Sequence, residues 1–558
     1  MTFFILSLLS AVLLSAGFLF PHCGGFALFA FVPLLIMDRM ASQQKVKHFF
    51  WWHYLTFLMW NLFTTFWVCN ATFAGGLAAS VVNALLMSAI WSLFRLFKTR
   101  FGKALPYLFL ASMWVAWERF YFDAEISWPW LTLGNAFAYS TTCIQWYDIT
   151  GTLGGSLWIW ACNLAIFGIL TTTAEGKWDS LNKKARYAAA AGTIALIAGP
   201  LAFSWIKYAT FEENTAEGSL DVCLLQPNLD PYEKFESLSQ AQQNGILLDL
   251  IREYDKQYTL ANGQAADSLH PILYLAPETA TDDIILNELN NSETLFAFKK
   301  EFADKPNANI LFGASSYQFF WQEKAPSYTA RQLRNGAWYE NYNSAIMSDG
   351  TPRTEIYHKS RLVIGTEKMP WPRVFSKIEK ALGGNIMGHC IGQSEVSLLN
   401  FVCNDTTGIK AAGMPAGKVP LGCAVCYESV YPEYFASYIG KGAKAMTVIT
   451  NDAWWGDTPG YKQHLRYSCL RAIETRRDIA RCANTGISAF INQRGDIVSC
   501  TNWDERCFHA GRINFNSGES FYVRHGDMTG RLCTFIFLLM IFALGVNLIT
   551  LKKSGRIR

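Results

Sequence analysis

Cys426 lies where an apolar, β-rich run, Leu421–Val425, gives way to residues that favour a helix. A cysteine at such a strand-to-helix turn would expose its sulfur. The amides of the first helical turn would lower its pKa and bind the oxyanion of an attacked carbonyl. These features predict a nucleophile. Two other interpretations remain open, because Cys423 and Cys426 form a C-x-x-C pattern typical of half a zinc site or a redox pair, and because a buried thiol often only packs.

Two more predicted strands end in ionisable side chains of complementary type. Glu278 closes the segment Tyr274–Glu278, and Lys359 closes Ile356–Lys359. Together these side chains could carry out acyl transfer. The thiol would attack, the carboxylate would take the thiol proton, and the ammonium would stabilise the oxyanion. Each residue also has a simpler explanation, since a glutamate after proline often caps a helix and a lysine at a strand end is usually solvated. Spacing alone does not bring the three together.

These residues belong to a region, about 219–522, whose composition is that of a soluble α/β domain. Helices are expected at 237–256 and 462–483. Strands that alternate with helices predict a layered fold of sheets covered by helices. The strand candidates are 221–226, 270–277, 308–314, 342–347, 421–426, 445–450 and 487–492.

The rest of the chain is too apolar for an ordinary soluble enzyme. Of the 558 residues, 51% are hydrophobic and only 16% are charged, which implies a membrane region. The first apolar run has no basic start and no cleavage site, so it predicts a retained membrane helix. Eight segments come near the length that crosses a bilayer. They are 2–20, 24–37, 50–69, 74–97, 105–122, 154–174, 187–207 and 531–551.

Basic residues collect in every second loop, after the second, fourth, sixth and eighth predicted spans. The connection 122–153 contains acidic residues and neither lysine nor arginine. By the positive-inside rule both termini are cytoplasmic, and the soluble domain lies on the outer side. The domains expected are a seven-helix membrane bundle at 1–207, an extracytoplasmic catalytic domain at 208–525 and a final membrane helix with a basic tail at 526–558.

Composition also narrows the partners. The net charge of +4 is small for this length and no basic run tracks a groove, so no nucleic-acid partner is expected. The 14 cysteines show no metal-ligand spacing, so no metal site is expected, and disulfides cannot be assigned.

The order of the motifs resembles the carbon-nitrogen hydrolase (nitrilase) superfamily with its Glu-Lys-Cys triad. Pro-Glu278 is followed by His-Lys359, then by Cys-Tyr-Glu428, and last by the segment 451–457, Asn-Asp-Ala-Trp-Trp-Gly-Asp. Within that superfamily the chain is similar to the apolipoprotein N-acyltransferase family. The shared features are the eight spans, Gln226-Pro-Asn228, the segment 357–363 with Glu367 after it, Gln463-His-Leu465 and Arg471-Ala-Ile-Glu474.

The resemblance implies Glu278 as general base, Lys359 as stabiliser of the transition state and Cys426 as nucleophile. It also implies supporting or substrate-binding roles for Phe235, Glu367, Tyr427 and Glu428. The sequence departs from the family at three places, where Gln-Pro-Asn replaces Gln-Gly-Asn, Phe235 replaces tryptophan, and Ile364-Gly-Thr-Glu367 replaces Pro-Phe-Gly-Glu. The departures leave the triad intact and concern the lid and the acyl pocket.

The implied fold is a helical membrane bundle of eight spans that carries an αββα sandwich. The implied activity transfers a fatty acyl chain from a phospholipid to the N-terminal amine of a diacylglyceryl-cysteine apolipoprotein, through a cysteine thioester and without a cofactor. The expected setting is the bacterial cytoplasmic (inner) membrane, with a monomeric, multi-pass protein whose catalytic domain is periplasmic. Two alternatives stay open, a membrane-tethered amidase that uses water instead of the lipid amine and a non-enzymatic transporter or scaffold.

Overall fold

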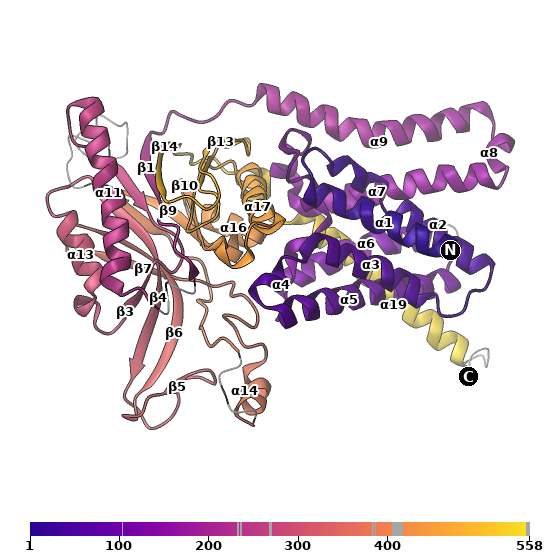
Figure 1. Cartoon of the computed structure of the whole chain (residues 1–558). Coiled ribbons are helices and arrows are strands. Elements are labelled where there is room, and N and C mark those ends of the chain that lie inside the picture. Colours follow the sequence, from indigo (N-terminus) through magenta and orange to yellow (C-terminus); the bar gives the residue numbers. More distant parts are fainter. Residues whose placement is uncertain are drawn as a thin grey trace. The chain divides into compact units, whose positions relative to one another are not determined.

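The computed structural model describes residues 1–102, 104–231, 234, 237–266, 271–381, 384, 387–403 and 417–553. The chain forms two compact units (Figure 1). The first unit joins Met1–Phe211 to His525–Arg558, and the second is Glu212–Arg524.

The first unit is helical throughout its described residues. Short 3-10 segments, η1 to η4, lie at Gly24–Leu28, Pro129–Leu131, Leu133–Phe137 and Thr141–Cys143. The α-helices are α1 Thr2–Leu19, α2 Val32–Gln43, α3 Phe50–Thr65, α4 Val68–Ala71, α5 Phe73–Arg100, α6 Leu105–Asp123, α7 Tyr147–Ala174, α8 Lys177–Ser180, α9 Lys183–Thr210 and α19 Met528–Lys553.

Among the described residues, six helices are long and apolar enough to cross a membrane. Helices also occupy the two other ranges expected to span. Of these, α3 has 16 residues, fewer than the roughly 20 that a perpendicular helix needs, and α6 carries Glu118, Arg119 and Asp123. The number of spans therefore stays a prediction. The six helices are Thr2–Leu19, Gly24–Gln43, Phe73–Arg100, Tyr147–Ala174, Lys183–Thr210 and Met528–Thr550.

The interior of this unit is rich in aromatic side chains. It also contains polar side chains that hydrogen-bond to backbone N–H groups. Phe31 stacks on Trp160 with ring centroids 4.1 Å apart. The Asn163 amide accepts from the Phe31 N–H at 2.7 Å, which satisfies a donor at the start of α2. Glu118 is buried and accepts from the Leu133 N–H at 2.9 Å and from Trp114 Nε1 at 3.0 Å. Buried polar groups thus connect the short segments to the long helices.

The second unit is built on two β-sheets. In the first the order is β14-β1-β2-β4-β6-β5, with β3 on β4 and β7 on β6, and in the second it is β13-β12-β11-β10-β9-β8. The strands are β1 Ser219–Gln226, β2 Ile272–Leu275, β3 Thr281–Ile285, β4 Ala308–Phe320, β5 Arg331–Gln332, β6 Trp338–Asp349, β7 Thr354–His358, β8 Leu399–Val402, β9 Lys418–Val425, β10 Ala445–Thr450, β11 Ile479–Ala483, β12 Ala489–Ile491, β13 Ile497–Cys500 and β14 Cys507–Asn514.

The two sheets pack face to face and helices cover their outer faces. One hydrophobic cluster contains residues of both sheets, such as Val222 of β1 and Leu421 of β9. A second cluster joins the other face of the first sheet to α11 Gln240–Asn262 and α13 Glu293–Glu301, which lie along that sheet (Figure 1). On the second sheet, α16 Pro432–Gly440 contacts β9 and α17 Pro459–Thr475 contacts β12. The layers are therefore α, β, β and α.

All seven predicted strand segments overlap strands of this unit, but the predicted helix at 462–483 is wrong at its end. Helix α17 stops at Thr475, and Arg476 adopts a left-handed conformation with φ 52°. The following Ile479–Ala483 is a fully buried central strand, β11. Its sequence, Ile-Ala-Arg-Cys-Ala, carries one charged residue, and that residue, Arg481, is buried in an ion pair with Asp452. The remaining helices of this unit are α14 Pro372–Ala381 and α18 Phe521–His525, the latter ending at the boundary.

Candidate active site

Glu278 follows the end of β2 and lies against Gly313 of β4. The Gly313 N–H donates to the Pro277 carbonyl at 3.0 Å, and a Cβ on Gly313 would lie 2.5 Å from the Glu278 Cα, so this approach requires glycine. The Glu278 carboxylate is buried, and its Oε2 accepts from the Asn451 N–H at 3.1 Å. Because Asn451 follows β10, this bond ties the carboxylate of the first sheet to the second sheet.

Lys359 follows the end of β7 and is almost completely buried. Its Nζ donates to Oε1 of Glu278 and to Oε1 of Glu367, each at 2.9 Å. Burial alone would lower the pKa of this ammonium, but the two carboxylates outweigh it and hold the pKa well above its ordinary value. The lysine is therefore a fixed positive charge.

Asn343 of β6 joins the same cluster, although sequence reasoning does not single it out. Its Nδ2 lies 2.7 Å from Oε1 of Glu278 and 2.7 Å from Oε1 of Glu367, so both carboxylates accept from one amide. Its carbonyl accepts from the Lys359 N–H at 2.7 Å. The signal in the sequence is an amide within an otherwise apolar strand candidate, which by itself could equally belong to a solvated strand end.

Glu367 owes its position to a tight turn at one of the places where the sequence departs from the family. Gly365 has φ 85°, a value that favours glycine, and its N–H donates to the Lys368 carbonyl at 2.9 Å. The Val363 N–H donates to Glu367 Oε2 at 2.7 Å. The Ile-Gly-Thr sequence thus still positions the Glu367 carboxylate against the Lys359 ammonium.

Cys426 is the first residue after β9 and adopts φ 52°, a left-handed conformation that is strained for a side chain with a Cβ. The turn at this position agrees with the prediction, but two details do not. The thiol is buried rather than exposed, and a five-residue 3-10 segment, η6 Cys426–Val430, precedes α16. Burial, and next the charge of Glu278, raise the pKa of the thiol well above its ordinary value, and Lys359 only partly opposes this. The expected lowering of the pKa is therefore wrong.

The three predicted residues thus come together from both sheets. The charges of Glu278 and Lys359 both act on the Cys426 thiol, and those two side chains are in direct contact. A protonated thiol beside a carboxylate and a fixed ammonium can attack a carbonyl carbon when the carboxylate takes the proton.

Glu428 is completely buried and accepts only from groups of the protein. Its Oε1 lies 2.6 Å from the Tyr357 hydroxyl and 2.6 Å from the N–H of Ser360, the residue after the lysine. Its Oε2 accepts at 2.8 Å from the N–H of Val425, the residue before the nucleophile. Glu428 therefore ties the loop of the lysine to the turn of the cysteine.

The structure says less about the roles of the other two predicted residues, Tyr427 and Phe235. Tyr427 is buried beside the nucleophile, and its ring meets that of Tyr431 edge-on at 5.1 Å. Phe235 lies outside the described residues. Lys234, close to it in the sequence, is buried and its ammonium donates to the carbonyl of Thr279, the residue after Glu278. Burial lowers the pKa of Lys234 to about 8, and its position was not predicted.

The third departure, Gln226-Pro-Asn228, lies where β1 ends. The Gln226 side chain donates to the carbonyls of Asn502 and Glu505 at 3.0 and 2.9 Å. Asn228 has φ 50° and its N–H donates to the Asn484 carbonyl at 3.0 Å. The motif therefore anchors the chain that enters the segment of Phe235.

A buried network beneath Cys426 was also not predicted from the sequence. His464 Nε2 lies 3.0 Å from the Cys426 carbonyl, which can only accept, so this nitrogen carries a proton. Its Nδ1 lies 3.0 Å from Asp452 Oδ1, and Arg481 donates to Asp452 Oδ2 at 2.6 Å. Ser429 also donates to the Cys426 carbonyl, at 2.7 Å. All four side chains are fully buried, so the network holds the strained turn in place.

Burial alone would raise the pKa of Asp452, but Arg481 and His464 outweigh it and hold the pKa below its ordinary value. Asp452 is therefore a fixed negative charge in the network. Among the described residues, no group of three or more histidine, cysteine, aspartate or glutamate side chains could hold a metal ion. Cys423 and Cys426 are both free thiols.

Comparison with known proteins finds two family models and many relatives. Residues 10–165 match the N-terminal domain of apolipoprotein N-acyltransferase, and residues 300–519 match carbon-nitrogen hydrolase. An apolipoprotein N-acyltransferase of Chlorobaculum tepidum is 28% identical over 540 residues, covering 95% of this chain and 94% of the relative. One of Geobacter metallireducens is 24% identical over 545 residues, covering 95% and 93%.

Solved structures also match, at low identity. A nitrilase-superfamily protein of Saccharomyces cerevisiae is 12% identical and covers 54% of this chain and 93% of its own, with a TM-score of 0.33. An amidase of Nesterenkonia is 14% identical and covers 57% and 97%, with a TM-score of 0.34.

Proposed function

Because the chain belongs to the apolipoprotein N-acyltransferase family, we propose that it moves a fatty acyl chain from a phospholipid to the N-terminal amine of a diacylglyceryl-cysteine apolipoprotein. The chain is an acyltransferase of lipoprotein maturation. The observation that carries the proposed mechanism is the cluster in which a buried thiol meets a carboxylate that is bonded to a permanently charged lysine.

In the first half-reaction the Cys426 sulfur attacks the ester carbonyl of the phospholipid, and Glu278 takes the thiol proton. A C–S bond forms, the carbonyl electrons move to oxygen, and Lys359 stabilises the oxyanion. When the oxyanion collapses, the ester C–O bond breaks and Glu278 returns its proton to the leaving oxygen. The products are an acyl thioester on Cys426 and a lysophospholipid.

In the second half-reaction the neutral amine of the lipoprotein attacks the thioester carbonyl, and Lys359 again faces the oxyanion. The C–N bond forms, the C–S bond breaks, and Glu278 passes the amine proton to the departing sulfur. The enzyme returns to its starting state and the lipoprotein carries an amide. This ping-pong route uses only side chains of the chain itself.

The supporting residues have distinct parts in this scheme. Glu367 and Asn343 share the contacts of Lys359 and Glu278 and so orient both groups. Glu428 positions the turn of the nucleophile against the lysine loop. Tyr427 matches a supporting or substrate-binding position of the family, and Phe235, which stands where the family has tryptophan, is assigned the same kind of role.

The proposal includes the setting of the enzyme. Eight helices cross the bacterial cytoplasmic (inner) membrane as a bundle at 1–207 and a final helix within 526–558, and the catalytic domain at 208–525 faces the periplasm. Support comes from six apolar helices and from basic loops that recur after every second span. The enzyme works as a monomer, without nucleic acid.

The test uses the purified full chain in vesicles with labelled phospholipid acyl chains and a synthetic peptide that begins with diacylglyceryl-cysteine. We expect one lysophospholipid for each N-acylated peptide. A peptide whose amine is acetylated serves as the control and should accept nothing. Free fatty acid without acylated peptide would indicate a hydrolase or amidase, and no lipid turnover by a folded protein would indicate a scaffold.

A further inference from the structure

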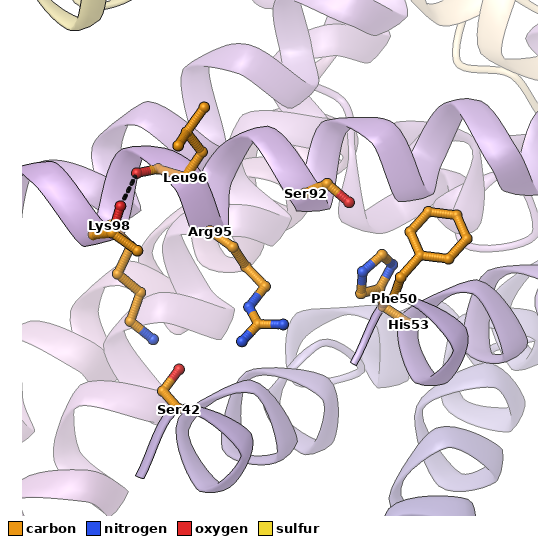
Figure 2. A pocket seen from close by; sticks show the side chains of 8 residues that line it. Ser42, Phe50, His53, Ser92, Arg95, Leu96 and Lys98 are labelled. Carbon is orange, nitrogen blue, oxygen red and sulfur yellow. Dashed lines mark hydrogen bonds between the residues drawn. The ribbon is translucent and has the colours of Figure 1, made fainter. Parts of the chain in front are cut away.

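A cavity with charged and apolar sides lies in the first unit, where α2 ends, α3 begins and α5 ends. Its volume is about 440 Å³, within the roughly 300–1,000 Å³ of small-ligand sites. Figure 2 shows the side chains of Arg95 and Lys98 projecting from α5 into this space, with Ser42 opposite them and Phe50 and His53 to one side. The lining residues are Ser42, Phe50, His53, Ser92, Arg95, Leu96, Lys98 and Thr99.

The charges at this cavity do not balance. Arg95 Nε and Lys98 Nζ share one buried carboxylate, that of Asp38, at 3.0 and 2.6 Å. Two cations on one anion leave a single positive charge. Lys45 and Lys47, in the exposed connection between α2 and α3, add two more positive charges to this end of the unit. The cavity therefore favours an anion.

Donors at the cavity remain unused. Among the described residues, the two terminal nitrogens of Arg95 have no hydrogen-bond partner, because its ion pair uses Nε and its guanidinium otherwise rests on the Phe49 ring at 4.4 Å. Nδ1 of His53 is likewise buried without a partner in the described chain, on a side chain only 1% exposed. Buried polar groups such as His53 Nδ1 are rarely left unpaired, and the Arg95 guanidinium, on a side chain that is 28% exposed, can reach a ligand in the cavity.

We propose that this cavity binds a phosphate group. The paired terminal nitrogens of an arginine match two phosphate oxygens, and a lysine adds a point charge. Ser42 and Ser92 line the same space; each hydroxyl donates to a backbone carbonyl at 2.8 Å, of Asp38 and Ser88 respectively, and can exchange that bond for a phosphate oxygen by rotating. Phe50 and Leu96 give the cavity an apolar side that suits a glycerol backbone.

Two kinds of ligand could supply the phosphate group, the headgroup of an anionic phospholipid and free inorganic phosphate. The cavity lies at helix ends that carry the basic loops, where basic pockets between membrane helices hold anionic headgroups. None of its residues belongs to the catalytic cluster. The site therefore does not depend on the proposed reaction, and its failure would leave that reaction untouched.

Three variants test the site. Arg95→Gln removes the guanidinium group, while Lys98 keeps its ion pair with Asp38. Ser42→Trp fills the cavity and retains every charge. Lys183→Gln, on an exposed residue at the start of α9, removes one positive charge from elsewhere in the unit and is the matched control.

Native mass spectrometry of the full chain measures the ligand, with phosphatidylglycerol, neutral phosphatidylcholine or inorganic phosphate added in turn. We expect one phosphatidylglycerol to bind selectively to the wild type and to Lys183→Gln, and about tenfold weaker binding to Arg95→Gln and Ser42→Trp, as for the loss of one charged hydrogen-bond pair. Selective binding of inorganic phosphate that the same two variants weaken would support the site with free phosphate as the source. Equal binding of charged and neutral lipid, or variants that bind like the wild type, would overturn it.

Discussion

At the scale of single residues, the account gives two neighbouring glutamates different tasks. Glu278 and Glu367 both bind Lys359 and Asn343, but only Glu278 is among the charges that most affect the Cys426 thiol. Replacing Glu278 by glutamine removes the proton acceptor and preserves the shape. We expect Glu278→Gln to slow thioester formation by about 10²–10⁴-fold.

The matched change Glu367→Gln should cost less, because it weakens the charge that orients the lysine and leaves the acceptor in place. Single-turnover rates with labelled phospholipid compare the two variants, and a lipid-binding measurement checks that both still take up the donor. A larger loss in Glu367→Gln than in Glu278→Gln would reverse the assignment of the general base.

The pH dependence of thioester formation follows from two raised pKa values. Since the pKa of Lys359 lies well above its ordinary value, the ammonium keeps its charge as pH rises through the usual lysine range near 10.4. Since the pKa of Cys426 is also raised, mainly by burial, the thiol stays protonated through the usual cysteine range near 8.5. We therefore expect a rate that is flat between about pH 7.5 and 10.

Quenched-flow measurement of the thioester at each pH tests this expectation. A rise centred near pH 8.5 would mean that the thiol titrates like a free cysteine, and a fall centred near 10.4 would mean that the lysine loses its charge. Transfer to the amine should behave differently, since an α-amino group becomes a nucleophile only above its pKa of about 8.

At the scale of elements, the turn after β9 is held from below by α17. His464 of α17 donates to the Cys426 carbonyl, and Asp452 and Arg481 fix the imidazole. Asp452, His464 and Ser429 have the residue types of a hydrolase triad, but the serine is completely buried and its hydroxyl is used to hold the nucleophile's backbone. His464 is thus a positioning residue.

We expect His464→Ala to slow thioester formation by about 10²-fold at saturating phospholipid, because a small displacement of the sulfur is enough. The KM for phospholipid should hardly change. His464→Gln can place an amide donor near the position of Nε2 and should recover most of the rate. If a folded His464→Ala protein loses about 1–3 kcal/mol of stability but forms the thioester at the normal rate, the network is only structural.

Several strands and the positions of Glu278, Lys359 and Cys426 at strand ends could be predicted because each is a local feature, whereas the grouping of the three residues came from the family resemblance and their catalytic roles stay a prediction. A strand shows as a short apolar run, and Glu278, Lys359 and Cys426 each stand at the end of one. The partners could not be predicted, because a bond such as Asn343 to Glu278 depends on which strands become neighbours, and that is set by the packing of both sheets. The predicted end of the helix at 462–483 was wrong for the same reason. Arg481 lies in a buried strand, where its ion pair with Asp452 depends on the packing of the domain.

The pKa of the Cys426 thiol was the other feature that was predicted wrongly. The sequence predicts a helix after Cys426, whose dipole would lower the thiol pKa. Burial of the thiol, which depends on how the two sheets pack and is not visible in the sequence, raises the pKa and has the larger effect. The family itself was predicted correctly from the order of the motifs and is confirmed by the relatives that span the chain.

At the scale of the whole molecule, the account requires the catalytic domain to lie outside the cytoplasm. The basic loops predict this orientation, and the sequence predicts seven crossings before the domain. A reporter that is active only in the cytoplasm should be silent when it is fused after Lys359. The same reporter fused after residue 558 should be active and serves as the control.

Activity after Lys359 would contradict the orientation. The first helices to re-examine would then be α3, which has only 16 residues, and α6, which carries three charged side chains. An odd number of spans lost from the first seven would move the domain to the cytoplasmic side.

The central claim is that Cys426 carries the acyl chain between the two substrates. Intact-mass spectrometry of the full chain after exposure to phospholipid, without acceptor, tests it most directly. We expect one acyl adduct that maps to Cys426, is absent in Cys426→Ser and disappears when a diacylglyceryl-cysteine peptide is added. Acylated peptide without any adduct, or an equal adduct in folded Cys426→Ser protein, would contradict it.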